Sequence, residues 1–192
     1  MKLGVVIPYL NNSEQAEELC RNLFLNKLLP AHEKNKNILP LLYTDFEEIG
    51  CGAIRNIGID YFVNVNKVDF IIFIDSDDDL EDNYLEEVYN ACTYAKRDKF
   101  NVIETRFVIR KNPVEFKDND KLPTHCTGIA YSTDLLKDIR FNEELKIGED
   151  EDFNKRLKAS HEIRKMYLDV KYIYNLGLNN DCLTYRHLRG EI

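Results

Sequence analysis

Apolar and polar residues follow one another along the first half of the chain in blocks that predict strands and helices in turn. The run from Leu3 to Pro8 is short, apolar and β-branched, and apolar residues then recur at helical spacing from Ala16 to Leu28. This pattern predicts a strand followed by a helix. The same alternation predicts strands over 38–43 and 70–74 and helices over 53–63 and 80–96. Three strand–helix units in succession indicate an α/β fold with a parallel sheet at its centre.

The second half of the chain has a different pattern of apolar and polar residues. Its patterns predict strands over 102–110 and 127–132, a helix over 150–159 and one or two closing strands over 163–174, with a polar loop over 112–123. A chain of 192 residues has room for one domain of ordinary size. No linker, repeat or low-complexity tract divides it, so we predict a single domain over 1–192 whose second half adds mixed strands to the α/β half.

Charge is concentrated in two segments. Residues 75–82 hold six acidic residues and no basic one, and residues 143–152 hold six acidic residues and one basic one. The net charge of the chain is −8, so the residues outside these segments together carry +3. Dense like charge is costly unless water, a helix N-terminus or a metal ion opposes it. We therefore look for function in these two segments.

Several classes of protein are disfavoured by composition. No apolar run approaches the roughly 20 residues that span a bilayer, and the N-terminus lacks the longer apolar segment of a secretory signal. We therefore expect a cytoplasmic protein. The five cysteines are widely spread with no Cys-x-x-Cys pair, which argues against a disulfide framework and a zinc site.

The first acidic segment directly follows the apolar run Phe70 to Ile74. Ligands of open α/β folds bind at the carboxyl ends of the strands, and Asp75 with Asp77 is a pair that can hold a hard divalent cation. Helix capping by 77–79 is one alternative. A calcium loop is disfavoured, because Leu80 stands where its turn needs glycine. A phosphatase of the haloacid-dehalogenase type is a third alternative, with Asp75 as nucleophile, Asp77 as proton donor, and Asp150 or Asp152 helping to hold magnesium.

Five motifs taken together resemble the family 2 glycosyltransferases of GT-A fold. In chain order they are Val5-Val6-Ile7-Pro8-Tyr9-Leu10-Asn11, Ala53-Ile54-Arg55-Asn56-Ile57-Gly58, Phe73-Ile74-Asp75-Ser76-Asp77-Asp78, Gly148-Glu149-Asp150-Glu151-Asp152-Phe153 and Cys182-Leu183-Thr184-Tyr185-Arg186. The resemblance implies a GT-A type, Rossmann-like nucleotide-binding half over 1–99 and an acceptor-binding half over 100–192. It also implies a nucleotide-diphospho-sugar donor, most simply a UDP-sugar.

The resemblance assigns roles at the donor end. Asp77 and Asp75 would hold Mn²⁺ or Mg²⁺ on the diphosphate, where a Lewis acid stabilises the charge of the leaving group. Pro8 and Tyr9 would lie under the base, and Asp45 would accept a ring NH of uracil. Arg55 and Arg186 would reach the nucleotide, and His187 is a candidate metal ligand.

At the acceptor end the resemblance implies inversion by a single displacement, which needs a base for the acceptor hydroxyl. The motif puts this base at Asp150. Glu149 beside it would bind the acceptor, and Asp152 is both an acceptor-binding candidate and the substitute for the base.

The resemblance leaves several acceptors open. They are a saccharide, a lipid-linked sugar reached by peripheral membrane attachment, and a modified DNA base, which the net charge of −8 disfavours. The rival functions are the phosphatase and a nucleotide-sugar binding module without catalysis.

Overall fold

The computed structural model describes residues 1–10, 13–111, 115–118 and 125–176. Its strands are β1 (Leu3–Tyr9), β2 (Ile38–Thr44), β3 (Phe70–Phe73), β4 (Asp79–Leu80), β5 (Val102–Lys111), β6 (Glu115–Asp118), β7 (Ile129–Ser132) and β8 (Lys165–Leu176). Its helices are α1 (Glu14–Leu23), α2 (Leu29–Lys34), α3 (Cys51–Asp60), α4 (Tyr84–Asp98), α5 (Thr133–Leu136) and α6 (Glu149–Ser160). Two π-helical turns, Phe24–Leu28 and Tyr61–Asn66, extend α1 and α3.

These strands form one mixed sheet in the order β2-β1-β3-β7-β5-β8-β4, with β6 paired to β5. The predicted parallel centre is confirmed for β1, which lies parallel to both β2 and β3. From β7 onward the sheet is mixed, because β7 is antiparallel to β3 and to β5, whereas β5 and β8 run parallel. The carboxyl end of β3 is therefore flanked by both halves of the chain.

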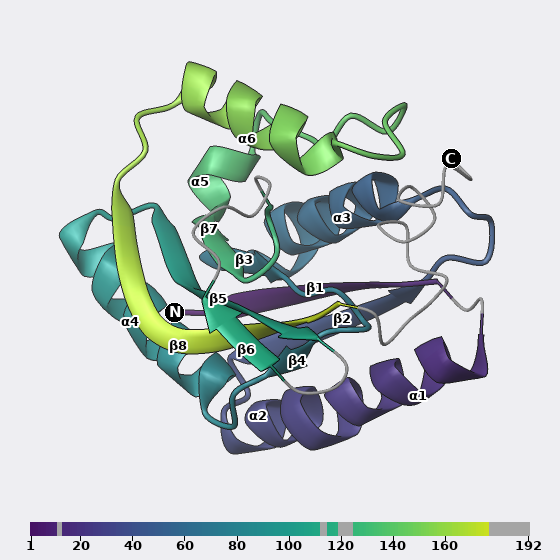
Figure 1. The fold of residues 1–192 in the computed structure, drawn as a ribbon. Helices are drawn as coiled ribbons and strands as arrows, with labels where there is room; N and C mark the ends of the chain where they lie inside the picture. The colour runs from purple at the N-terminus through teal and green to yellow at the C-terminus, as the bar shows by residue number, and fades with distance from the viewer. Residues whose placement is uncertain (11–12, 112–114, 119–124, 177–192) are drawn as a thin grey trace.

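Alternate residues of the central strands pack into two separate cores. Val5 and Ile7 of β1 face the core under α1, α2 and α4, whereas Val6 faces the core under α3, α5 and α6. Figure 1 shows α1 and α2 on one side of the sheet and α3, α5 and α6 on the other. Burial on both faces explains why β1 and β3 have no polar alternation.

A glycine brings α3 close to the sheet. A Cβ atom at Gly58 would lie 2.6 Å from both methyl carbons of Val6, so only glycine fits where the helix approaches β1. This close approach brings α3 near the end of β3, which the first acidic segment follows.

Element boundaries differ from the prediction at the helix after β3 and in the polar loop expected over 112–123, where Glu115–Asp118 form the strand β6. The helix expected over 80–96 begins at Tyr84 behind Asn83, while Asp79 and Leu80 pair with β8 as the short strand β4. The alternative in which residues 77–79 cap this helix is therefore wrong. The closing segment, predicted as one or two strands, forms the single strand β8, which curves in Figure 1. Within the described residues, no helix is both long and apolar enough to span a bilayer.

Candidate active site

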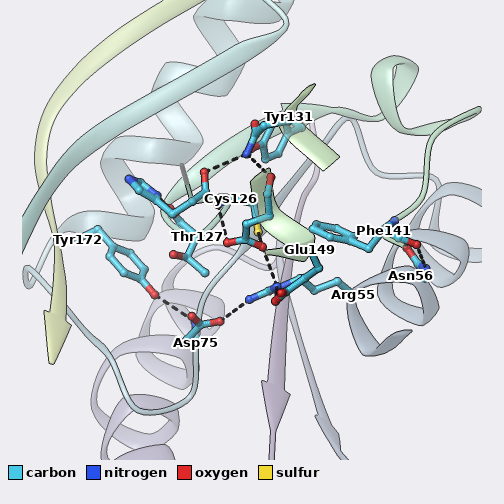
Figure 2. A network of polar contacts seen from close by, with 12 residues as sticks. Arg55, Asn56, Asp75, Cys126, Thr127, Tyr131, Phe141, Glu149 and Tyr172 are labelled. Carbon is cyan, nitrogen blue, oxygen red and sulfur yellow. Dashed lines mark hydrogen bonds and ion pairs between the residues drawn. The ribbon is translucent and has the colours of Figure 1, made fainter. Parts of the chain in front are cut away.

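The two acidic segments meet at one arginine. Arg55, on α3, donates from Nη2 to Asp75 Oδ1 at 2.8 Å and from Nη1 to Glu149 Oε1 at 3.2 Å and Asp150 Oδ1 at 3.0 Å. Figure 2 shows its side chain between Asp75 and Glu149. Asp75 follows β3 in the first half of the chain, and the other two carboxylates begin α6 in the second half. One guanidinium thus joins the two halves.

The guanidinium of Arg55 is buried, with 3% of the side chain exposed. Burial lowers the pKa of Arg55, but Cys126, Asp150 and Asp75 around it raise the pKa well above its ordinary value. The ring of Phe141 lies 5.4 Å from the guanidinium carbon. Arg55 is therefore a fixed cation that is shared by three carboxylates, and its contact with the nucleotide stays a prediction.

Two of the facing carboxyl groups bind protons more tightly than usual. Burial raises the pKa of Asp75, and the Asp150 charge raises it further against the opposing effect of Arg55. Burial also raises the pKa of Glu149, again with Arg55 opposing and Asp150 reinforcing the shift. A single guanidinium does not neutralise three ionised carboxylates. The excess negative charge favours the binding of a further cation.

The loop after β3 is held by strand β8. The Asp75 amide donates to Tyr172 Oη at 3.1 Å, and Tyr172 Oη donates to Asp78 Oδ2 at 2.5 Å. The Asn175 amide donates to Asp78 Oδ1 at 2.9 Å, and its side-chain nitrogen donates to the Asp77 carbonyl at 2.8 Å. These bonds position Asp75 and Asp77, two of the three predicted metal ligands.

Asp78 and Tyr172 are site-supporting residues that sequence reasoning missed. Asp78 is 3% exposed, and its burial, together with the charges of Asp77 and Asp75, raises its pKa well above the ordinary value. A run of adjacent aspartates predicts acidity, but only the fold shows which of them points inward.

The start of α6 separates Asp150 from Asp152. Gly148 adopts the left-handed conformation (φ 80°) before the helix, and Asp150 then faces Arg55. Asp152 pairs with Arg156 one turn along, at 2.6 Å and 2.8 Å. Asp150 is thus brought together with Asp75 and Arg55, and Asp152 belongs to a separate ion pair.

The residues expected at the nucleotide base lie at the ends of β1 and β2. Pro8 and Tyr9 are buried, and the Tyr9 carbonyl accepts from the Asp45 amide at 2.7 Å. The Asp45 carboxylate accepts from the amides of Ile49 and Gly50, both at 2.9 Å. Asp45 therefore shapes the turn that leads into α3, and its contact with uracil stays a prediction. Arg186 and His187 lie outside the described residues.

The donor set suits a magnesium or manganese ion that is shared with phosphate. Within the described part of the chain, no three His, Cys, Asp or Glu side chains are arranged to hold a metal by themselves. Mg²⁺ in phosphate-transfer sites is commonly held by one or two carboxylates together with substrate phosphates and water. Asp75 and Asp77 fit this pattern.

Comparison with known proteins gives structural matches. No protein-family model and no curated protein matches the chain. The structure of S. aureus TarS 1-349 in complex with UDP is 20% identical, with a TM-score of 0.64, over 92% of this chain and 61% of its own length. Its complex with UDP-GlcNAc is 20% identical, with a TM-score of 0.63, over 91% of this chain and 58% of its own length. A197 from STIV is 18% identical, with a TM-score of 0.56, over 90% of this chain and 84% of its own.

These similarities show the fold. The chain has a GT-A-like glycosyltransferase fold with a mixed sheet, which confirms the predicted fold class. It spans about three fifths of the TarS 1-349 structures.

Proposed function

We propose that this protein is a glycosyltransferase that moves a sugar from a nucleotide-diphospho-sugar, most simply a UDP-sugar, to an acceptor hydroxyl. The observation that carries the proposal is the meeting of Asp75 and Asp150 at Arg55, which sets the candidate metal ligand beside the candidate base. The fold shared with TarS, solved with UDP and UDP-GlcNAc, supports the same donor class.

At the donor end, Asp75 and Asp77 would hold Mn²⁺ or Mg²⁺. When bound, the ion supplies Lewis-acid stabilisation of the negative charge that grows on the diphosphate leaving group. Tyr172 and Asn175 keep the aspartate loop in place. Pro8, Tyr9 and Asp45 would form the base-binding end. Arg186 remains a proposed contact to the nucleotide, and His187 remains a proposed metal ligand.

At the acceptor end, Asp150 would act as general base in an inverting displacement. A base must lie within hydrogen-bond reach of the proton that it removes. Asp150 is preferred to Asp152, whose carboxylate is paired with Arg156. Glu149, whose side chain is 13% exposed, is the acceptor-binding candidate beside it, with Asp152 further along the helix.

The acceptor must present a hydroxyl group, which several classes of molecule carry. A hydroxyl of a saccharide or of a lipid-linked sugar fits the reaction, and a modified DNA base is disfavoured by the net charge of −8. The acceptor is best sought after the donor is known.

The first experiment is thermal unfolding with UDP, GDP, dTDP and CMP, each with and without Mn²⁺. A ligand at about 100 times its Kd stabilises by roughly 2.7 kcal/mol, which for a domain of this size is a shift of about 5–10 °C. We expect this shift for UDP in the presence of Mn²⁺. Asp77→Asn should abolish it, whereas Asp150→Asn should keep it and lose sugar transfer. Asp82→Asn, which removes a fully exposed carboxylate of the same acidic segment, is the matched control.

The rivals give different results in the same assay. Stabilisation by Mg²⁺ with beryllofluoride, and by none of the nucleotides, would favour the phosphatase with Asp75 as nucleophile. Nucleotide binding without any turnover of UDP-sugars, even by slow hydrolysis, would favour the binding module.

A further inference from the structure

Both oxygens of the Asp150 carboxylate are engaged, and one residue reaches both of them. Oδ1 accepts from Arg55 Nη1 at 3.0 Å and lies 2.9 Å from Cys126 Sγ. Oδ2 accepts from the Cys126 amide at 3.0 Å. Figure 2 shows Cys126 above Arg55 and Glu149. Cys126 therefore defines the orientation of the carboxylate plane.

The thiol is the donor in this contact. Cys126 is fully buried. Burial raises its pKa well above the ordinary value, and the Asp150 charge adds to this shift while Arg55 opposes it. At neutral pH the thiol is thus protonated, and a carboxylate facing it can only accept. Two donors then converge on Oδ1, one charged and one neutral, whereas Oδ2 accepts only the Cys126 amide among the described residues.

The backbone around Cys126 is held without the thiol. The Gly128 amide donates to the Phe73 carbonyl at 2.9 Å, and the Gly128 carbonyl accepts from Thr105 Oγ1 at 2.7 Å. Asn154 Nδ2 donates to the His125 carbonyl at 3.2 Å and to the Asp150 carbonyl at 3.0 Å. Replacing the thiol alone should leave this segment against α6, so its contribution to Asp150 can be tested in a folded protein.

We propose that Cys126 is a positioning residue that holds Oδ1 of Asp150 toward Arg55 and leaves Oδ2 as the atom that receives the acceptor proton. In the step, the acceptor O–H proton passes to Oδ2 while the acceptor oxygen bonds to the anomeric carbon. The bond from that carbon to the diphosphate oxygen breaks, and its electron pair leaves with the diphosphate. This inference rests on the proposed function, which makes Asp150 the base.

The kinetic test uses the full chain with UDP-GlcNAc and Mn²⁺. Its readout is the rate at which UDP is released when the sugar is transferred to water or to an acceptor. Cys126→Ala should lower kcat by about 10- to 100-fold, the size expected when a reacting group is misplaced, with KM for UDP-GlcNAc unchanged. Cys126→Ser keeps a hydroxyl donor and should restore most of the rate. Cys92→Ala, which removes a fully buried thiol from the other core, is the matched control and should keep the wild-type rate.

A spectroscopic test reads the contact itself. The S–H stretching band of Cys126, identified by its loss in Cys126→Ala, should lie at a frequency lowered by hydrogen bonding. It should rise in Asp150→Asn, because an amide oxygen is a weaker acceptor than a carboxylate. A band that does not move would overturn the assigned contact.

Failures of the two proposals look different. If wild-type protein releases UDP and Cys126→Ala keeps the full rate, or Cys126→Ser is as impaired as Cys126→Ala, the positioning role is wrong while the proposed function stands. If the wild type releases no nucleotide from any sugar donor of UDP, GDP, dTDP or CMP, the proposed function fails and the base role of Asp150 fails with it.

Discussion

The guanidinium of Arg55 carries one positive charge and faces three carboxylates, with 3% of its side chain exposed. Charges removed from water are tolerated only when they are paired and hydrogen-bonded. Each carboxylate here depends on the same cation, so the arginine contributes both to folding and to the geometry between Asp75 and Asp150.

We predict that Arg55→Ala lowers the free energy of unfolding by about 3–5 kcal/mol, because it removes the cation that three part-buried carboxylates share. Arg55→Lys should lose less stability, since it keeps the charge, but an ammonium group lacks the planar fork that reaches three partners. Urea denaturation measures both variants. Lys137→Ala, which breaks the exposed pair with Asp134, should change stability by at most about 1 kcal/mol. Equal losses in Arg55→Ala and Lys137→Ala would contradict the assigned role.

Helix α3 is the element that carries Arg55 to the sheet. Its Gly58 lies against Val6 of β1. Its Asn56 holds the segment before α6, since Nδ2 donates to the Phe141 carbonyl at 3.0 Å and Oδ1 accepts from the Phe141 amide at 2.8 Å. The distance between the two acidic segments therefore depends on where α3 rests.

Gly58→Ala should destabilise the protein by about 1–3 kcal/mol through overpacking against Val6, because the added Cβ would be 2.6 Å from its methyl carbons. As α3 moves outward, UDP binding in the presence of Mn²⁺ should weaken. Gly52→Ala on the same helix is the matched control, since its Cβ would meet nothing closer than 3.4 Å. Thermal unfolding with and without UDP and Mn²⁺ measures both effects. Equal behaviour of the two variants would show that the close approach is not limiting.

At the scale of the whole molecule, stability depends on the pH at which the buried carboxyl groups ionise. Burial raises the pKa of Glu149 above its ordinary value of 4.5, so the folded protein binds this proton more tightly than the unfolded chain. The resulting stabilisation is fully present below the unfolded pKa and is lost as the pH rises through the folded pKa.

Glu149→Gln should therefore flatten the decline of the unfolding free energy above pH 4.5. Urea denaturation at a series of values between about pH 4 and 7 measures it. The control is Glu151→Gln, which makes the same change at an exposed position two residues along α6. A decline of the same slope in wild type and Glu149→Gln would mean that this carboxyl does not set the pH dependence.

The sequence by itself determined the central strands, the order of strand–helix units and the two acidic segments at their ends. Those features are local, because hydrophobic periodicity records which face of an element is buried. The tertiary structure alone decided which acids meet. Arg55 is 20 residues from Asp75 and 95 from Asp150, and Tyr172 is 94 residues from Asp78. Contacts over such separations depend on how the strands are ordered and how closely α3 and α6 approach the sheet, and no spacing along the chain encodes these distances.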